Sequence, residues 1–354
     1  MCKKLYLAGE AGAGKTAIAL GFALHLQEKG QNVAYFKPKT ESRQPPHNKD
    51  ADASLMKKVL GLPWSNEQIA PLNFESIYIF GPSDHIHAST EKMVDKLETS
   101  LEKFTANAQI VLIEGGKHPG ACTSLSLDDL SLAQKWQAPV ILVSNLEKDI
   151  DLDRLLLYND LMQAKGINLL GNIFNNIPHT ILNKAREVYQ PLLEEKGYKL
   201  LGTIPSHHEV AFPTVAEFQE ALQGEVLTGE ENLGLPVEEI VIGAMTIGGT
   251  LRFLRRAINK AVITGGDRSD MALTALETSI SVLVLTGGLY PDIRVITRAR
   301  EKNVPVLLVH CDTYTTIGLL QNIVRQIRPD DTKTITLFKD EVNRHCPWEK
   351  IMQL

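Results

Sequence analysis

The sequence predicts an α/β fold in which a doubly wound, mostly parallel sheet carries a phosphate-binding loop and precedes a smaller α/β domain. Three observations support this prediction. Short apolar runs alternate with helical patterns from residue 5 to residue 205, which is typical of strands covered on both faces. A glycine-rich octapeptide separates the first apolar run from the first helical stretch. A second, shorter alternating series begins near residue 240.

The first series contains six strand candidates, at residues 5–8, 33–36, 110–113, 140–143, 169–174 and 200–204. Helical patterns lie between them, for example at 90–104 and 151–165. Pro205 ends the series, and residues 213–236 are polar and acidic. Such a composition shift is typical of a connection, so it places the domain junction in this segment.

The second series contains strand candidates at 240–242, 261–263, 282–285 and 304–309, with helical patterns at 251–258, 271–278 and 293–302. It predicts another α/β unit of about a hundred residues. We therefore expect domains at 1–212 and 213–330, followed by a C-terminal tail at 331–354. The tail has one more apolar run, 334–338, to which the sequence assigns no element.

Bulk composition excludes several classes of function. The 354 residues are 44% hydrophobic and 22% charged, which are ordinary globular values. The net charge of −5 disfavours binding to nucleic acid or to an anionic membrane. No run approaches eighteen apolar residues, so no membrane span is expected. The four cysteines are far apart and form no C-x-x-C pair, which is typical of reduced thiols in a cytoplasmic protein.

One motif carries chemistry that its residues explain directly, namely Gly9-Glu10-Ala11-Gly12-Ala13-Gly14-Lys15-Thr16, which continues into Ala17 at the start of the helical stretch. It matches G-x-x-x-x-G-K-[ST] between a strand and a helix, the context that makes it a phosphate loop. Its backbone N–H groups and the helix N-terminus attract phosphate oxygens. We expect Lys15 to reach the β- and γ-phosphates of ATP and the Thr16 hydroxyl to bind Mg²⁺.

Charged residues follow two other strands of the first series. Glu114 ends the strand at 110–113 and is the best candidate for a Mg²⁺ ligand, because ligands bind at this edge of such sheets. Asp50 and Asp52 precede a helix, and either can supply a second carboxylate or cap that helix. Lys37 and Lys39 follow the strand at 33–36, where they suit an anionic transition state or are surface lysines.

Small and polar clusters also follow three strands of the second series. They are Gly265-Gly266-Asp267-Arg268, Thr286-Gly287-Gly288 and Cys311-Asp312-Thr313. Successive strand ends converge on one sheet edge, which is the geometry of a small-molecule crevice. The alternative is that the glycines only form turns and that Asp267 and Arg268 form a local ion pair.

Residues 1 to about 210 resemble dethiobiotin synthetase and the related amidotransferase synthetases of cobyrinic acid. The matching segments are the phosphate loop, 36–38, 50–53, 113–116, 171–175 and 202–205. Residues from about 213 to 330 resemble the DRTGG domain through 242–245, 266–268, 286–288 and 312–313. The two in this order resemble the N-terminal half of the long form of phosphate acetyltransferase.

The resemblance implies roles for individual residues. Thr16, Asp52 and Glu114 would hold Mg²⁺, and Lys15 would contact the phosphates. Lys37 would stabilise the transferring phosphoryl group or an acyl-phosphate-like intermediate. Asn175 would recognise the edge of the base, with Pro205 packing on it. Relatives of both modules imply a homo-oligomer.

Two functions follow as hypotheses. The first is a regulator that binds Mg-ATP in the first domain and a small ligand in the second, hydrolyses ATP slowly and reports to a partner enzyme of metabolism. The second is an ATP-dependent ligase that activates a carboxylate or carbamate as a mixed phosphoric anhydride. Nothing after residue 213 resembles a glutaminase or acetyltransferase domain. Lys37, Asp52 and Glu114 favour turnover, whereas the DRTGG-like domain and a loop with Glu10-Ala11-Gly12 in place of the Thr-Asp-Thr of dethiobiotin synthetase favour regulation.

Overall fold

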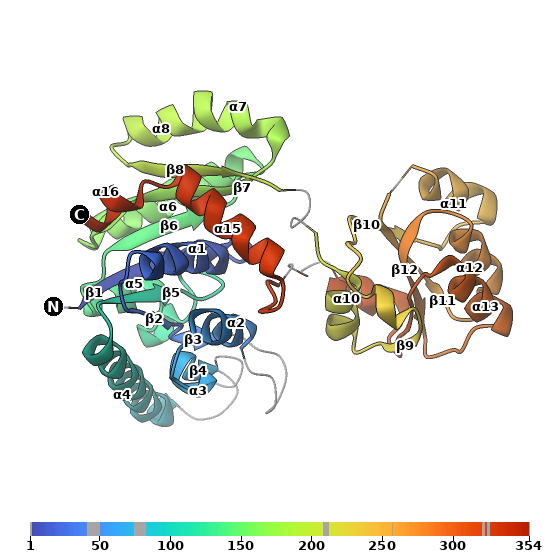
Figure 1. Cartoon of the computed structure of the whole chain (residues 1–354), viewed down its shortest axis with the longest axis horizontal. Coiled ribbons are helices and arrows are strands. Elements are labelled where there is room, and N and C mark those ends of the chain that lie inside the picture. The colour runs from blue at the N-terminus through green and yellow to red at the C-terminus, as the bar shows by residue number, and fades with distance from the viewer. Residues whose placement is uncertain are drawn as a thin grey trace. The chain divides into compact units, whose positions relative to one another are not determined.

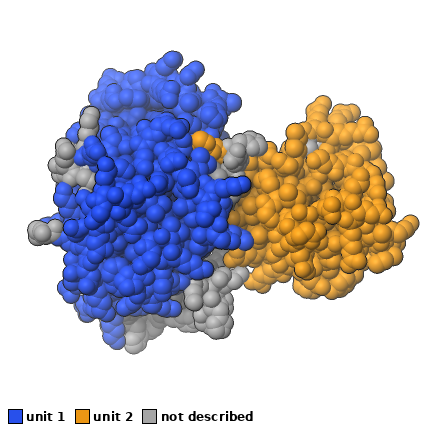
Figure 2. Space-filling model, in the orientation of Figure 1, with its two compact units in different colours: residues 1–206, 327–354 blue, residues 207–326 orange. Residues whose placement is uncertain are grey.

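The computed structural model describes residues 2–40, 50–73, 83–207, 212–256, 258–320, 323 and 326–353. They form two compact units, which Figure 2 shows in separate colours. The first unit consists of Met1–Ser206 together with Ile327–Leu354, and the second of His207–Gln326. The 331–354 tail, which the sequence left separate, therefore belongs with the first unit.

The first unit is built on a six-stranded sheet in which every neighbouring pair is parallel. Its order is β2-β5-β1-β6-β7-β8. The strands are β1 (Lys3–Ala8), β2 (Val33–Phe36), β5 (Ile110–Glu114), β6 (Val140–Ser144), β7 (Leu169–Ile177) and β8 (Leu200–Pro205). All six lie where apolar runs predicted them. The predicted doubly wound α/β fold is confirmed.

Helices cover both faces of this sheet (Figure 1). They are α1 (Lys15–Glu28), α2 (Ala51–Leu60), α3 (Asn66–Ile69), α4 (Ser83–Asn107), α5 (Asp129–Lys135), α6 (Asp149–Ala164), α7 (Leu182–Lys184) and α8 (Gln190–Glu195). Shorter elements are a β3 (Lys39–Thr40)–β4 (Leu72–Asn73) pair, η2 (Thr123–Leu125), η3 (His179–Ile181) and the π-helical turn η4 (Ala185–Tyr189). Because β1 lies in the middle of the sheet, its carboxyl end opens into the crevice between crossovers, where ligands bind.

The C-terminal tail forms α15 (Thr332–His345) and α16 (Trp348–Gln353). Figure 1 shows α15 alongside α1, the helix that follows the phosphate loop. Gly21 permits this approach, because a Cβ there would lie 2.8 Å from Cβ of Val342. The rings of Phe22 and Trp348 stack with their centroids 3.9 Å apart. The unassigned run at 334–338 is thus one turn of an amphipathic helix that completes the first unit.

We expect Trp348→Ala to lower the free energy of unfolding of the first unit by about 3–5 kcal/mol, the usual cost of deleting a buried aromatic ring. Trp348 is only 3% exposed. Urea unfolding followed by the fluorescence of Trp64 and Trp136, both in the first unit, measures the change. The control is Tyr314→Ala, an aromatic that is 88% exposed in the second unit. A loss below about 1 kcal/mol would mean that the tail does not pack there.

The second unit has a five-stranded sheet of order β10-β11-β12-β13-β9. Its strands are β9 (Glu225–Thr228), β10 (Glu239–Ile242), β11 (Lys260–Gly265), β12 (Ile280–Thr286) and β13 (Val306–Leu308). All pairs are parallel except β9 with β13. Its helices are α10 (Val215–Leu222), η5 (Glu230–Asn232), α11 (Ile247–Leu254), α12 (Ser269–Leu276), α13 (Ile293–Lys302) and α14 (Thr313–Leu320).

The expected junction at 213–236 holds three elements of this second unit instead, α10, β9 and η5. A capping box begins α10, because the Glu217 carboxylate accepts hydrogen bonds from both the backbone N–H and the hydroxyl of Thr214. The same carboxylate accepts a 3.0 Å hydrogen bond from the Gln326 N–H. The chain's entry into this unit and its exit are therefore joined at one buried side chain. Among the described residues, no helix is both long and apolar enough to cross a membrane.

Candidate functional site

The phosphate loop joins β1 to α1 at the carboxyl edge of the sheet. Gly12 and Gly14 have φ angles of 75° and 81°, in the left-handed region that favours glycine. A Cβ on Gly14 would lie 2.1 Å from Nδ2 of Asn175, and one on Gly9 would lie 2.2 Å from the Val143 carbonyl oxygen. Gly9 therefore packs directly against β6 and Gly14 against β7, and neither position has room for a side chain. These two contacts fix the path of the loop.

Lys15 is buried and curls back over the loop that precedes it. Its Nζ donates 2.8 Å hydrogen bonds to the carbonyl oxygens of Gly9 and Glu10. Burial lowers the pKa of this ammonium, although the nearby carboxylates of Glu114 and Asp129 oppose that shift. The Lys15 ammonium, held beside the phosphate loop by these two bonds, can donate charge-assisted hydrogen bonds to a bound anion.

Glu114 lies at the centre of the site. The Thr16 hydroxyl donates to its Oε1 and the Tyr35 hydroxyl donates to its Oε2, each over 2.8 Å. Burial raises the pKa of Glu114 to about 7, in spite of the positive charges of Lys37 and Lys15. Hydroxyl and carboxylate oxygens are the ligands that Mg²⁺ prefers, and Mg²⁺ usually binds one or two carboxylates together with nucleotide phosphates. Thr16 and Glu114 fit that donor set.

Lys37 lies between two carboxylates. Its Nζ is 3.2 Å from Oδ2 of Asp50 and forms a shorter ion pair with Asp52. Burial lowers the pKa of Lys37, but Asp52, Asp50 and Glu114 outweigh that effect and raise it overall. Asp50 also caps α2 by accepting a 2.8 Å hydrogen bond from the Ala53 N–H. Of the two roles that the sequence left open for Asp50, the structure shows the helix cap, and a role as a second metal carboxylate remains a prediction.

Asp52 does not cap a helix, and its carboxylate is occupied by Lys37. No group of three or more His, Cys, Asp or Glu residues suited to a metal occurs in the described part of the chain. The role of Asp52 as a third Mg²⁺ ligand remains a prediction.

Lys39 has a different set of partners from Lys37. Its buried Nζ pairs with Oδ1 of Asp129 at 2.9 Å and donates to the carbonyl oxygens of Ala121 and Leu127. The same Oδ1 accepts hydrogen bonds from the Tyr6 hydroxyl and the Gly116 N–H, each at 3.1 Å. This ion pair holds the loop after Glu114 against β1. Lys39 is therefore a structural residue rather than the second phosphate-binding lysine.

Asn175 and Pro205 lie on the neighbouring strands β7 and β8. The buried Asn175 amide donates a 2.8 Å hydrogen bond to the Ala13 carbonyl oxygen. Asn175 therefore contacts the phosphate loop itself. Its expected contact with the base, and the packing of Pro205 on that base, remain predictions.

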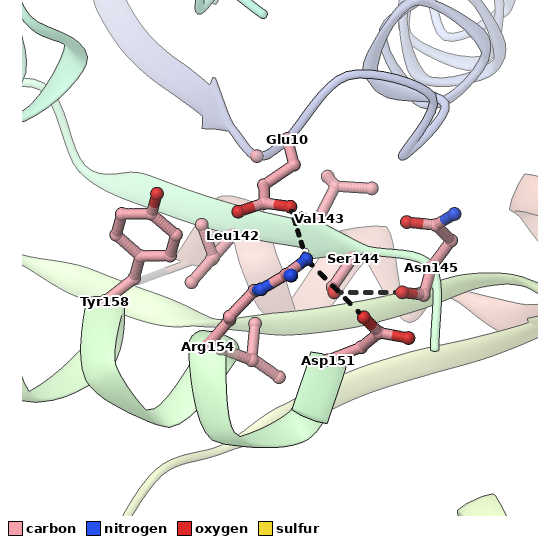
Figure 3. A pocket seen from close by; sticks show the side chains of 10 residues that line it. Glu10, Leu142, Val143, Ser144, Asn145, Asp151, Arg154 and Tyr158 are labelled. Carbon is pink, nitrogen blue, oxygen red and sulfur yellow. Dashed lines mark hydrogen bonds and ion pairs between the residues drawn. The ribbon is translucent and has the colours of Figure 1, made fainter. Parts of the chain in front are cut away.

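A small pocket of about 30 Å³ opens beside Gly9 and Glu10. Figure 3 shows the Arg154 guanidinium between two carboxylates, 3.5 Å from Glu10 and 3.7 Å from Asp151. Ser144, Asn145 and Tyr158 complete its polar lining. The volume suits one or two water molecules rather than a nucleotide. Arg154 therefore fastens the start of the phosphate loop to α6.

The three polar clusters of the second unit meet at one sheet edge. Gly265 pairs with Thr286 in the sheet register, and the hydroxyl oxygens of Thr286 and Thr313 are 2.8 Å apart. The Gly287 and Gly288 N–H groups donate to the carbonyl oxygens of Cys311 and Val309. Asp267 is exposed there.

Two residues of these clusters have local partners. Arg268 pairs at 3.1 Å with Asp270, not with Asp267 as the turn-only alternative required. Asp312 begins α14 and accepts hydrogen bonds from the backbone N–H groups of Tyr314 and Thr315. Asp312 therefore has a capping role, and its part in a ligand site remains a prediction.

Family models match both parts of the chain. A model of the AAA domain, AAA_26, matches residues 3–214, which is more than half of the sequence. The chain belongs to this AAA domain family. A model of the DRTGG domain matches residues 217–323, within the second unit. The expected architecture, a P-loop domain followed by a DRTGG domain, is confirmed.

Curated relatives of this AAA-domain chain include phosphate acetyltransferases. That of Nitratidesulfovibrio vulgaris is 26% identical over 368 residues, covering 98% of this chain and 50% of the relative. The ATP-dependent dethiobiotin synthetase of Methanococcus vannielii is 28% identical over 203 residues, covering 55% of this chain and 89% of the relative. The chain thus spans about half the length of the acetyltransferases that it matches.

Solved structures with a similar fold include MinD of Aquifex aeolicus, at 14% identity and a TM-score of 0.36, covering 59% of this chain and 84% of MinD. They also include the CBS and DRTGG regulatory region of Clostridium perfringens pyrophosphatase, at 18% identity and a TM-score of 0.27, covering 41% of this chain and 70% of that one.

Proposed function

We propose that the P-loop domain binds Mg-ATP and that the chain is a nucleotide-dependent regulator in acyl-phosphate metabolism, with slow ATP hydrolysis. The contact that carries the proposal is the 2.8 Å hydrogen bond from the Thr16 hydroxyl to Glu114. It joins the hydroxyl of the phosphate loop to a buried strand-end carboxylate, which is the oxygen donor set for a Mg²⁺ bound with nucleotide phosphates.

The proposal of a regulatory role is based on the second unit and on the phosphate acetyltransferases that match the chain. A DRTGG domain follows the P-loop domain, and its strand ends converge on a polar edge suited to a small ligand. The relatives that match nearly the whole chain are phosphate acetyltransferases, of which this chain spans about half. We propose a metabolic enzyme as the partner and a homo-oligomer as the assembled form.

A ligase is the second candidate, and the buried Lys37 favours it. Its ammonium lies beside Asp50 and Asp52 and close enough to Glu114 to affect the pKa of that carboxyl. Positive charge at this edge stabilises a transferring phosphoryl group. In that reaction a carboxylate or carbamate oxygen would attack the γ-phosphorus of ATP and displace ADP, so that an acyl phosphate forms.

ATP turnover distinguishes the two candidates. Purified protein of residues 1–354 is incubated with Mg²⁺ and ATP, alone and with a panel of carboxylic acids, amines and nucleotides. A regulator is expected to bind ATP tightly and to release phosphate slowly, at a rate that no acid or amine increases. Strong acceleration by one acid or amine, with a product of matching mass, would identify a ligase. Absence of ATP binding would exclude both candidates.

We expect Asp267→Ala to leave ATP affinity unchanged within about twofold, because Asp267 belongs to the second unit, outside the phosphate loop. The variant should lose binding of any panel compound that the second unit holds. Calorimetric titration of both ligands measures the two effects separately. Parallel loss of both affinities would contradict two separate sites.

A further inference from the structure

Both carboxylate oxygens of Glu114 are held by hydroxyl groups from different elements. Thr16, at the start of α1, donates to Oε1, and Tyr35, on β2, donates to Oε2. The sequence predicted a role for Thr16 and none for Tyr35. An ionised carboxylate has roughly four lone-pair sites, so these two bonds leave acceptor capacity for a metal ion or its bound waters.

The sheet register explains how Tyr35 reaches Glu114. Strands β2 and β5 are parallel neighbours, and Tyr35 is paired with Leu112. Leu112 and Glu114 are two residues apart on β5, so their side chains lie on the same face of the sheet. Diagonal neighbours are roughly 7–8 Å apart, a distance that an aromatic side chain spans. The phenol ring therefore runs along that face and ends at the carboxylate.

The hydroxyl of Tyr35 is the polar exception in a strand of apolar residues, Val33-Ala34-Tyr35-Phe36. Tyr35 is completely buried. A phenylalanine would give the same ring, whereas a buried hydroxyl is costly unless it forms a hydrogen bond. Its hydroxyl bond goes to Glu114. The group that distinguishes Tyr35 from phenylalanine thus acts on this carboxylate.

We propose that Tyr35 is a positioning residue that fixes the Glu114 carboxylate for Mg²⁺ binding. This inference rests on the proposed binding of Mg-ATP at the loop. With Thr16 on one oxygen and Tyr35 on the other, the carboxylate is held at both ends and does not rotate toward Lys37 or Lys15. Residues that orient a metal ligand in this way typically contribute about 10–100-fold to metal affinity.

Tyr35→Phe tests the proposal, because it removes only the hydroxyl. The matched control is Tyr6→Phe on the neighbouring strand β1. Tyr6 is also completely buried, and its hydroxyl donates to Asp129 instead. ATP binding is measured over a range of Mg²⁺ concentrations and again in EDTA. Thermal unfolding of the first unit is followed by tryptophan fluorescence to confirm that each variant folds.

We expect Tyr35→Phe to raise the Mg²⁺ concentration for half-maximal ATP binding at least about tenfold. ATP affinity in EDTA should change by less than about twofold, and Tyr6→Phe should behave as wild type. A structural role alone would weaken binding equally with and without Mg²⁺, and that result would overturn the proposal. An unchanged Mg²⁺ requirement, or an equal shift in Tyr6→Phe, would also overturn it.

Rejection of the proposed function and rejection of the role of Tyr35 give different results in this experiment. If wild-type protein binds no ATP at any Mg²⁺ concentration, the function is rejected, and the role of Tyr35 with it. If wild type shows Mg²⁺-dependent binding and Tyr35→Phe matches it, only the role of Tyr35 is rejected. Placing Tyr35→Phe in a Glu114→Gln background adds a second check, because no further change in the Mg²⁺ response is expected once the carboxylate is absent.

Discussion

Replacement of Lys15 by alanine is expected to weaken ATP binding at least about 100-fold, which corresponds to roughly 3 kcal/mol. The ammonium of Lys15 is buried and lies over the carbonyl oxygens of Gly9 and Glu10, at the mouth of the loop. A phosphate that binds there gains charge-assisted hydrogen bonds from this group. Loop amides and the helix N-terminus would supply the residual affinity.

Calorimetric titration of ATP in the presence of Mg²⁺ measures this loss. Lys29→Ala is the matched control, because Lys29 is the exposed lysine at the opposite end of α1. The control should retain wild-type affinity, and both variants should unfold within a few degrees of wild type. Equal ATP affinity in Lys15→Ala and wild type would place the nucleotide elsewhere.

The second large effect is expected for Glu114→Gln, which should stabilise the folded first unit at alkaline pH while it removes the Mg²⁺ dependence of ATP binding. Burial raises the pKa of Glu114 from 4.5 to about 7. The folded chain therefore binds more protons at this residue than the unfolded chain does between these two pH values. The contribution of Glu114 to the free energy of unfolding is thus lost as the pH rises from about 4.5 to 7.

The size of that loss follows from the pKa change. A pKa raised from 4.5 to about 7 is equivalent to roughly 3 kcal/mol in the free energy of unfolding. Glutamine does not ionise, so Glu114→Gln should match wild type near pH 4.5. At pH 8 it should exceed wild type by up to about 3 kcal/mol.

Urea unfolding in EDTA at pH 5 and pH 8 measures the difference. The three tryptophans, Trp64, Trp136 and Trp348, all belong to the first unit, so their fluorescence reports on its unfolding alone. Glu341→Gln is a suitable control, since Glu341 is also a buried glutamate of the first unit but lies on α15. If Glu114→Gln were less stable than wild type at pH 8, burial of the ionised Glu114 carboxylate would not be destabilising, and the raised pKa would be contradicted.

The sequence predicted the strands and the phosphate loop because both depend on local patterns. Apolar runs identify buried strands, and the glycines with Lys15 and Thr16 specify one backbone shape. Glu114 was predicted for the same reason, as a charge at the end of an apolar strand. Strand β9 was not predicted, because its four residues lie in a polar segment and pair with a strand far along the chain.

The tail and Tyr35 required information about partners distant in sequence. A signal for α15 was present, because Asp331 caps the helix and Ile335, Phe338 and Val342 recur at helical spacing. Its partner α1 lies about 300 residues earlier, so no local pattern indicates the pairing. A tyrosine in an apolar run is ordinarily a core residue. Only the register between β2 and β5 reveals its bond to Glu114.

Lys37 and Lys39 show most directly what local sequence patterns cannot predict. Both follow the same strand and carry the same charge, so the sequence analysis treated them as a pair, either at the phosphate edge or on the surface. Pro38, which lies at a bend, separates them, and Lys39 begins the short strand β3. Lys37 then meets Asp50 and Asp52, whereas Lys39 enters the interior and pairs with Asp129. The positions of these carboxylates in the fold therefore determine the different environments of the two lysines.

Titration of ATP into the wild-type chain, once with Mg²⁺ and once with EDTA, tests the central claim most directly. Binding at this loop through Lys15, Thr16 and Glu114 predicts saturable binding to a single site, tighter with Mg²⁺ than with EDTA. Absence of saturable binding in both titrations, or equal affinity in the two, would contradict a Mg-ATP site built from these residues.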